Sequence, residues 1–423
     1  MPDIPLEIKL AIIDHLAGRF LDPFSGIALV WPEVIFRIRE HRFSTIRLRT
    51  PENLRWLLGI LEPMPPICAL VRAVEVTTTF AALQLYEGPD LPRLFKLLTK
   101  LTNVTLYSVQ PFSQPGTVAT FHCLPNTITN VDLHIFPDYA HSPTEAVTKT
   151  FELLSAFPCM DYLRLHCTLE DDIAMGEDTI TKIVAKPFPS LRTLRLECFL
   201  LESVSMRILI ERGLFPNLES LTIVDTDWNR RSVRVFDGIL RCWSDTLREL
   251  RMPLEGEAES NSGPLTFFLP PNLDILEFRI ALTGRRSTRV YGHDLYSDIW
   301  IRTLEQRCRS GATLRSLVLT VEFWWPKVHK ANAPGTTFIH RLDALIGSSK
   351  LHVMHLDWHL ILRQGDGMDL ESEDDDNFDD ESSPKTVFEW VNKNVFPATS
   401  ARFLTEAGRN TFGTTIELDQ IYL

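Results

Sequence analysis

The chain has 423 residues, of which 44% are hydrophobic and 23% are charged, a composition typical of a folded globular protein and not of a disordered one. Its formal net charge is −12, but residues 366–381 contain ten carboxylates and neither Lys nor Arg, so the other 407 residues sum to −2. A nearly neutral body lacks the basic surface that nucleic-acid binding requires. We therefore expect no nucleic-acid partner.

The cysteines and the N-terminus indicate the compartment. Seven cysteines are scattered along the chain without a CxxC pair, which predicts reduced thiols in a reducing environment. Glu7, Lys9 and Asp14 interrupt the first apolar run, so we expect no signal peptide there. No apolar run reaches transmembrane length. We predict an intracellular protein, cytoplasmic or nuclear, without a membrane partner.

Residues 1–43 form a segment of their own, expected to contain three short helices at 5–17, 22–30 and 32–42. Pro5 suits a first helical turn, and Asp3 and Gly18 suit the two ends of the first helix. The apolar residues of this helix cover roughly 200° of the helical wheel, where one core-facing stripe needs little more than about 100°. We assign Leu10 and Ile13 to internal packing, which leaves an apolar side for a partner.

From residue 43 onward a short pattern recurs: an apolar residue, two others, an apolar residue, one other, and an apolar residue. The central positions of its copies are Ile46, Val74, Val104, Val131, Leu163, Leu194, Leu221, Leu250, Leu276, Leu317 and Met354. Successive centres are 28, 30, 27, 32, 31, 27, 29 and 26 residues apart, and then 41 and 37. Single matches are expected by chance, whereas eight near-equal intervals indicate a structural repeat.

Each repeat is expected to contain one strand and one helix. Its last two apolar positions alternate with polar residues, as in Leu194-Arg195-Leu196, which is the period of a strand with one buried face. Helix-like stretches lie between copies, at 143–157, 201–212, 232–242 and 294–310. Such a unit cannot bury its own apolar face, so we predict an α/β solenoid with a parallel sheet on one side and helices on the other. One continuous sheet should bury Leu194, Leu196, Leu221, Leu250 and Leu276.

The stretches FPSLRTLRL and FPNLESLTI resemble the strand segments of leucine-rich repeats, and the resemblance covers residues 44–363. Regular repeats of that family have Asn or Cys three residues after the last strand position, where this chain has Thr168, Phe199, Thr226 and Glu255. We therefore expect an irregular solenoid with uneven curvature. The two long intervals imply insertions around 284–293 and 325–336.

The N-terminal segment resembles the F-box of fungal F-box proteins. The resemblance is carried by IPLEI (4–8), IIDHL (12–16), ALVW (28–31) and HRF (41–43), which leads into the repeats. It implies that the segment docks an Skp-type adaptor and, through it, a cullin. The expected adaptor contacts are Ile4, Pro5, Ile8, Ile12, Leu16, Leu29 and Trp31. The alternative is that residues 1–43 only cap the first repeat.

The expected function is that of a substrate-recognition subunit of an SCF-type ubiquitin ligase, whose solenoid binds an unknown target protein. We find no motif for a catalytic, nucleotide or zinc site, and expect neither enzymatic activity nor a cofactor. Two alternatives remain open. One is a ligase-independent repeat scaffold for protein binding, and the other is an enzyme or small-molecule receptor that uses the Trp- and His-bearing C-terminal repeats.

The C-terminal region combines a histidine-rich strand, an acidic segment and a cap. His355, Asp357 and His359 would share one strand face, but residues two apart on a strand lie about 6.6 Å apart and converge poorly on one metal ion, so we favour surface polar residues. Like-charge repulsion predicts disorder at 364–384. A helix at 386–395 and the final TIELDQIYL are expected to form a C-terminal cap at 385–423.

Overall fold

The computed structural model describes the elements of an α/β fold in two compact units, residues 1–191 and 192–423. The residues that it describes are 4–17, 27, 30–77, 85–86, 88–109, 120–135, 143–167, 186–197, 212–224, 230–254, 266–282, 293–325, 336–347, 351, 353–364 and 411–420. The helix expected at 201–212, the insertion at 284–293, the acidic segment and the helix at 386–395 lie almost entirely outside these residues.

Unit 1 begins with helices, as expected for residues 1–43. They are α1 (Leu6–Ala17), the 3-10 helix η1 (Pro32–Val34) and α3 (Ile35–Ser44). The chain turns into η1 at Pro32, the residue chosen from the sequence, because proline lacks the N–H that a first helical turn leaves unbonded. Ile27 and Val30 are also helical, in agreement with the helix expected at 22–30.

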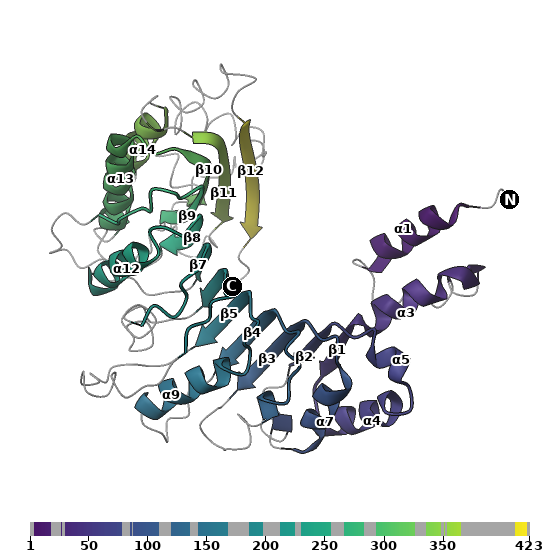
Figure 1. The fold of residues 1–423 in the computed structure, drawn as a ribbon. Helices are drawn as coiled ribbons and strands as arrows, with labels where there is room; N and C mark the ends of the chain where they lie inside the picture. The colour runs from purple at the N-terminus through teal and green to yellow at the C-terminus, as the bar shows by residue number, and fades with distance from the viewer. Residues whose placement is uncertain are drawn as a thin grey trace, which may run out of the picture. The chain divides into compact units, whose positions relative to one another are not determined.

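The sheet of unit 1 is parallel, and its strands neighbour one another in chain order (Figure 1). They are β1 (Thr45–Leu48), β2 (Ala73–Val76), β3 (Asn103–Val109), β4 (Asn130–Ile135) and β5 (Tyr162–Cys167). The intervening helices are α4 (Pro51–Leu61), α5 (Pro65–Cys68), α7 (Asp90–Leu97) and α9 (Pro143–Leu154). Helices α4, α7 and α9 lie along one side of this sheet (Figure 1).

The repeat pattern sets the strand register of unit 1. The central apolar residues of its copies lie side by side across the five strands, and all are buried: Ile46, Val74, Val104, Val131 and Leu163. Along each strand, the polar residues that alternate with the apolar ones point to the opposite face of the sheet, because successive strand residues alternate in direction. We call that opposite side of the sheet, in unit 1 and likewise in unit 2, the open face.

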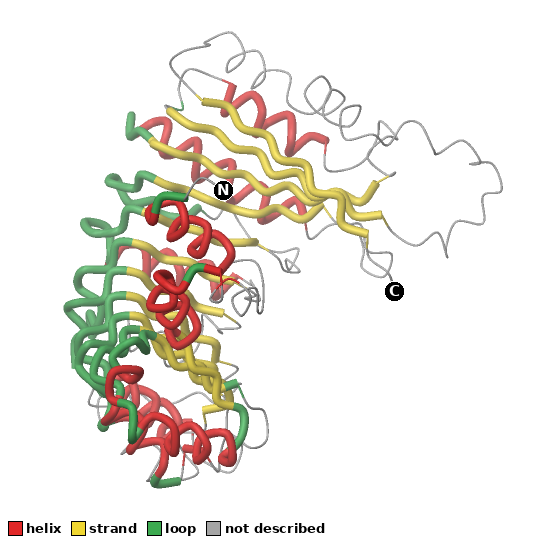
Figure 2. The backbone as a smooth tube through the Cα atoms, turned by 90° about the vertical axis from the view of Figure 1, so that its right-hand side faces the viewer, coloured by secondary structure: helices red, strands yellow, loops and turns green. Residues whose placement is uncertain are grey.

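Unit 2 has the same arrangement, with strands paired in parallel and in chain order. They are β6 (Thr193–Glu197), β7 (Ser220–Val224), β8 (Glu249–Leu254), β9 (Ile275–Leu282), β10 (Leu314–Trp325), β11 (Val353–Gln364) and β12 (Thr411–Gln420). The helices between them are α12 (Arg230–Cys242), α13 (His293–Ser310) and α14 (Thr336–Gly347). The strands lengthen toward the C-terminus, from five residues in β6 to twelve in β11 (Figure 2).

The sheet prediction for this unit is confirmed. Leu194, Leu221, Leu250 and Leu276 are register partners on consecutive parallel strands, and these four residues, like Leu196, are fully buried. The register continues through Leu317 to Leu356.

The last copy of the pattern was assigned wrongly. Leu317 pairs with Leu356 and not with Met354, which is 53% exposed. The copy therefore reads Val353, Leu356 and Trp358, two residues later than expected, and the interval from Leu317 is 39 residues. The C-terminal segment also differs from a simple cap, because β12 adds one more parallel strand beside β11.

A buried arginine ties α13 to the loops that precede β9 and β10. Arg307 donates to the backbone carbonyls of Pro270 at 2.7 Å, Leu273 at 2.9 Å and Thr313 at 2.8 Å. Burial lowers the pKa of Arg307 to about 10, with Asp274 opposing the shift, so the guanidinium stays charged at neutral pH. The helix ends at Ser310, and Gly311 follows with a φ of 68°, the left-handed conformation that terminates many helices. Among the described helices, none has the length and hydropathy needed to span a membrane.

Candidate functional site

A small apolar core holds α1 against η1 and α3. Its buried centre consists of Ile13, Val34 and Ile38, and the residues packed against it are Leu10, Leu16, Ile27 and Trp31. The internal packing expected of Leu10 and Ile13 is therefore confirmed. These contacts fix which side of α1 is left exposed.

Lys9 lies on the buried side of α1, inside the arc of apolar residues. Its ammonium donates to Glu33 at 2.6 Å and lies 5.8 Å from the centroid of the Trp31 ring. This hydrogen bond lowers the pKa of Glu33 below its ordinary value. The long aliphatic part of Lys9 covers apolar surface while its charged end finds a partner, so a lysine fits a mostly apolar contact.

A second polar cluster joins α1 to α3. The Asp14 carboxylate accepts from Arg37 Nε at 2.7 Å and Arg37 Nη2 at 3.0 Å, and it lies 2.8 Å from His41 Nε2. These hydrogen bonds, that from Arg37 first, lower the pKa of Asp14 from 3.8 to about 2. Bidentate guanidinium–carboxylate geometry restricts rotation of one helix about the other.

We expect Asp14→Asn to weaken this contact in a pH-dependent way. Because the folded state lowers the pKa of Asp14, the stabilisation is complete above pH 3.8 and shrinks as the pH falls toward 2. Asp14 is partly exposed, so solvent screening limits the loss at neutral pH to about 0.5–1 kcal/mol. Amide hydrogen exchange in α1 measures it: the variant should exchange faster than wild type at pH 7, with the difference narrowing toward pH 3. An undiminished difference at pH 3 would contradict the assignment.

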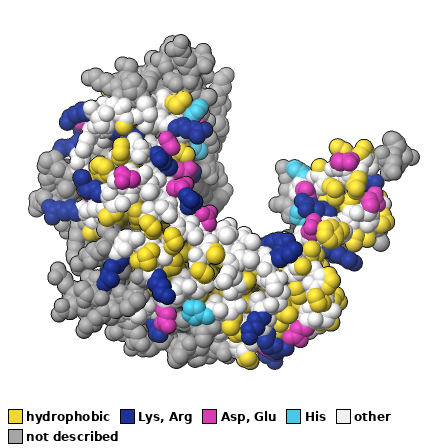
Figure 3. Space-filling view, viewed as in Figure 1, with side chains coloured by type: hydrophobic (Ala, Val, Ile, Leu, Met, Phe, Trp, Pro, Cys, Tyr) yellow, Lys and Arg dark blue, Asp and Glu magenta, His cyan; other side chains and the backbone are white. Residues whose placement is uncertain are grey.

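Large apolar side chains gather on the outer side of these N-terminal helices (Figure 3). Ile8 is 52% exposed and Phe36 is 64% exposed. We define the N-terminal apolar face as Ile4, Ile8, Val30 and Phe36. Leu6 is also exposed, but it precedes Ile8 by two positions and therefore lies on nearly the opposite side of α1, in line with the buried Ile13. Among the described residues eight large apolar side chains are exposed, and seven of them belong to residues 4–64. Such clustering is typical of surfaces that bind another protein.

The structure separates the residues predicted to contact an adaptor. Ile4, Pro5 and Ile8 are exposed and Ile12 is half-buried. Leu16 and Trp31 are half-buried against the internal core, so their principal contacts lie inside the segment and not on its outer surface. Leu29 lies outside the described residues.

The sequence interpretation missed Leu6 and Phe36 as exposed residues. Phe36 precedes the buried Ile38 by two positions, which corresponds to nearly opposite sides of a helix, so its exposure was detectable from spacing. Leu6 lies within the apolar arc, but it belongs to the first turn of α1, while the buried contact of that helix centres on Ile13. Only the position of the packing partners decides its exposure.

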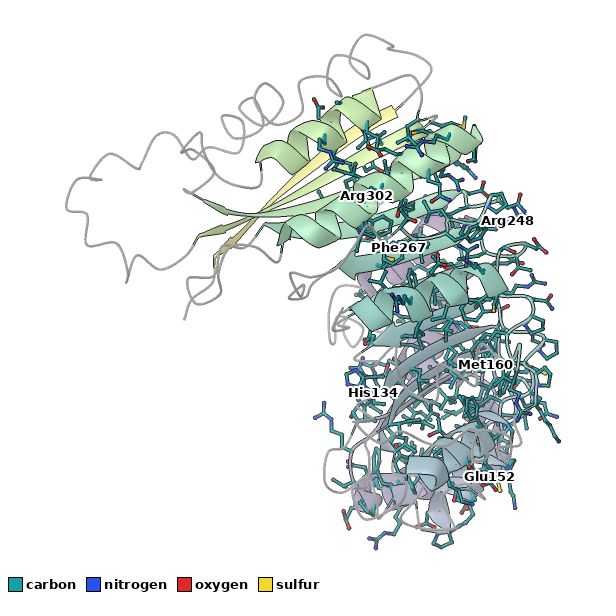
Figure 4. The ribbon with its side chains drawn as sticks, turned by 90° about the vertical axis from the view of Figure 1, so that its left-hand side faces the viewer. His134, Glu152, Met160, Arg248, Phe267 and Arg302 are labelled. Atoms are coloured by element: carbon teal, nitrogen blue, oxygen red, sulfur yellow. The ribbon has the colours of Figure 1, made fainter. Side chains whose placement is uncertain are left out.

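The open face of unit 1 carries a second candidate site, formed by stacked rings on three adjacent strands. The ring of His134 lies 4.0 Å from that of Tyr107 and 4.9 Å from that of His166, centroid to centroid, with interplanar angles of 23° and 24° (Figure 4, His134 labelled). Asp132 Oδ2 accepts from Arg164 at 3.3 Å, and Asp132 Oδ1 lies 3.3 Å from His134 Nε2. These polar and aromatic groups suit contacts with a protein partner.

The open face of unit 2 carries ion pairs. Arg251 lies 3.1 Å from Glu277 and 3.8 Å from Glu249, and Arg195 donates to Glu197 at 2.5 Å. In these pairs the positive and negative charges compensate locally. This face therefore favours a partner of mixed polarity over a polyanion.

The histidine-bearing strand is β11. His355, Asp357 and His359 alternate along β11 with buried Leu356 between the first two, as expected for one strand face. Within the part of the chain that the structure describes, no group of three or more His, Cys, Asp or Glu residues is placed to hold a metal ion.

Comparison with known proteins adds no family assignment: the chain matches no protein-family model and no curated protein. The fold therefore defines only a general class: an α/β protein with a parallel sheet whose strands follow chain order within each unit.

Proposed function

We propose that this chain is the substrate-recognition subunit of an SCF-type ubiquitin ligase, with an F-box formed by its N-terminal helices and an irregular leucine-rich-repeat solenoid behind it. The observation that supports this most directly is the N-terminal apolar face, held in place by its own small core, which exposes Ile4 and Ile8, two of the residues that the resemblance assigns to an Skp-type adaptor. A segment that only capped the first repeat would need its internal core, but exposed apolar side chains such as Ile8 and Phe36 would not stabilise it.

The proposed mechanism is proximity. The adaptor would link the N-terminal helices to a cullin, and the open faces of the sheet would hold a target protein near the ubiquitin-conjugating enzyme. Binding both on one scaffold replaces a bimolecular encounter with an intramolecular one, which raises the effective concentration of the target. The subunit itself needs no catalytic residue, and it would work in the cytoplasm or the nucleus.

Co-expression tests this proposal. We expect the full chain to elute with a Skp-type adaptor and a cullin as one complex in size-exclusion chromatography. Elution of the chain alone, with adaptor and cullin in a separate peak, would contradict it. That result would favour the ligase-independent repeat scaffold, for which the rings and ion pairs of the open faces are the supporting observation.

A further inference from the structure

Helix α4 exposes apolar residues on the side opposite its core contacts. Leu54, Leu58 and Leu61 are buried, whereas Trp56 is 70% exposed. Gly59 follows Trp56 by three positions, so these two residues lie on one side of the helix, and the exposed Pro63 follows the end of the helix. We define the α4 crest as these three residues together with the exposed Met64.

Neither the helix geometry nor the space around position 59 requires a glycine there. It lies in the interior of a helix, where glycine is less stable than alanine because it leaves the unfolded chain more freedom. A Cβ atom at this position would have no heavy atom within 4 Å. The missing side chain instead leaves the backbone of α4 open beside the indole of Trp56, where a partner can approach closely.

The N-terminal apolar face is too small to form a stable interface by its apolar contacts alone. Stable protein–protein interfaces bury about 800 Å² on each partner. The three aliphatic side chains of this face supply at most about 120 Å² each and Phe36 about 150–250 Å², so the face supplies roughly 600 Å² at most. Trp56 adds a side chain of the type that buries about 150–250 Å². Figure 3 shows apolar side chains over α1 and α3 and also over α4 and α5 on the same face of unit 1.

We propose that the binding surface continues from the N-terminal apolar face onto the α4 crest, and that a single Skp-type adaptor covers both. This inference rests on the proposed function and adds a contact in the first repeat helix, outside the segment that resembles an F-box. Trp56 is its expected energetic centre, because exposed tryptophans that become buried in an interface contribute disproportionately to affinity.

The test is a calorimetric titration of the full chain with purified Skp-type adaptor. We expect Trp56→Ala to raise the Kd by about 10- to 100-fold without changing the melting temperature, because this side chain is mostly exposed in the free protein. Gly59→Gln should raise the Kd at least about tenfold while keeping or raising the melting temperature, because glutamine favours the helix and only a partner would meet its side chain. Met354→Ala changes another exposed apolar residue, in unit 2, and is the control; it should leave the Kd within about twofold of wild type.

The possible outcomes separate this inference from the proposed function. Normal adaptor binding by both α4 variants would overturn the continued surface and leave the proposed function intact. No binding by the wild-type chain would overturn the proposed function and this inference together. Light scattering tests whether a second copy of the chain occupies the α4 crest. A wild-type dimer that Trp56→Ala converts to a monomer would assign the crest to that second copy and overturn the inference.

Discussion

Replacing Ile4 and Ile8 together with Asp is expected to raise the Kd for a Skp-type adaptor by at least two to three orders of magnitude while leaving the chain folded. Both side chains are exposed in the free protein, so charged replacements cost little there. Burying each in an interface contributes about 1.5–3 kcal/mol, and an unpaired carboxylate in the same place adds a desolvation cost. Since 1.4 kcal/mol corresponds to about tenfold in Kd, the combined effect is large. Ile12 is unsuitable for this test because it is half-buried.

Two control variants make the result specific. Met354→Asp changes a residue of unit 2 that is 53% exposed, against 52% for Ile8, and should bind the adaptor normally. Ile13→Asp puts a charge into the internal core and should unfold the N-terminal helices, which lowers binding by a different route that a loss of helical signal reveals. Normal binding by the Ile4/Ile8 variant in a calorimetric titration with the adaptor would show that the helices are only a cap.

Replacing Arg307 with Met is expected to lower the free energy of unfolding of unit 2 by about 2–4 kcal/mol. Methionine keeps much of the volume but donates no hydrogen bond. The carbonyl of Pro270 keeps the bond from the Leu273 N–H, whereas those of Leu273 and Thr313 lose the guanidinium. Buried carbonyls that lose a charged donor each cost about 1–3 kcal/mol, and the regained solvation of the arginine offsets part of this.

Urea unfolding followed by circular dichroism measures this loss. The matched control is Arg309→Met on the same helix, where the side chain is exposed and the expected change is within about 0.5 kcal/mol. Equal midpoints for the two variants would mean that the carbonyl contacts of Arg307 contribute nothing beyond those of a surface arginine.

The sheet could be predicted from the sequence because its signals are local and repeated. Period-two alternation marks each strand, and near-equal spacing marks the repeat, so Leu194, Leu221 and Leu250 were placed correctly without any knowledge of their neighbours. The same reasoning failed at Met354 because two overlapping readings satisfy the pattern. Pairing with β10 selects the copy centred on Leu356, and that pairing is a tertiary interaction.

The candidate sites depended more heavily on tertiary structure. The excess of apolar residues in residues 4–16 indicated a surface for a partner, because a single helix has only one core-facing side. Which residues are exposed was decided by the packing of α1 on η1 and α3, which covers Leu16 and Trp31 and leaves Leu6 and Phe36 outside.

The buried charged residues also show which features follow from the sequence and which depend on the tertiary structure. The sequence by itself determined strand positions, helix starts at prolines and a near-neutral body, since each depends on residue types at short spacing. It could not determine that Lys9 reaches Glu33, that His134 stacks on Tyr107 and His166, or that Arg307 binds three carbonyls, since each contact joins elements that only the fold brings together. A lysine or arginine looks alike on a solvated face and in a buried contact until its partners are placed, because the cost of burying its charge depends on the hydrogen bonds that the tertiary structure supplies.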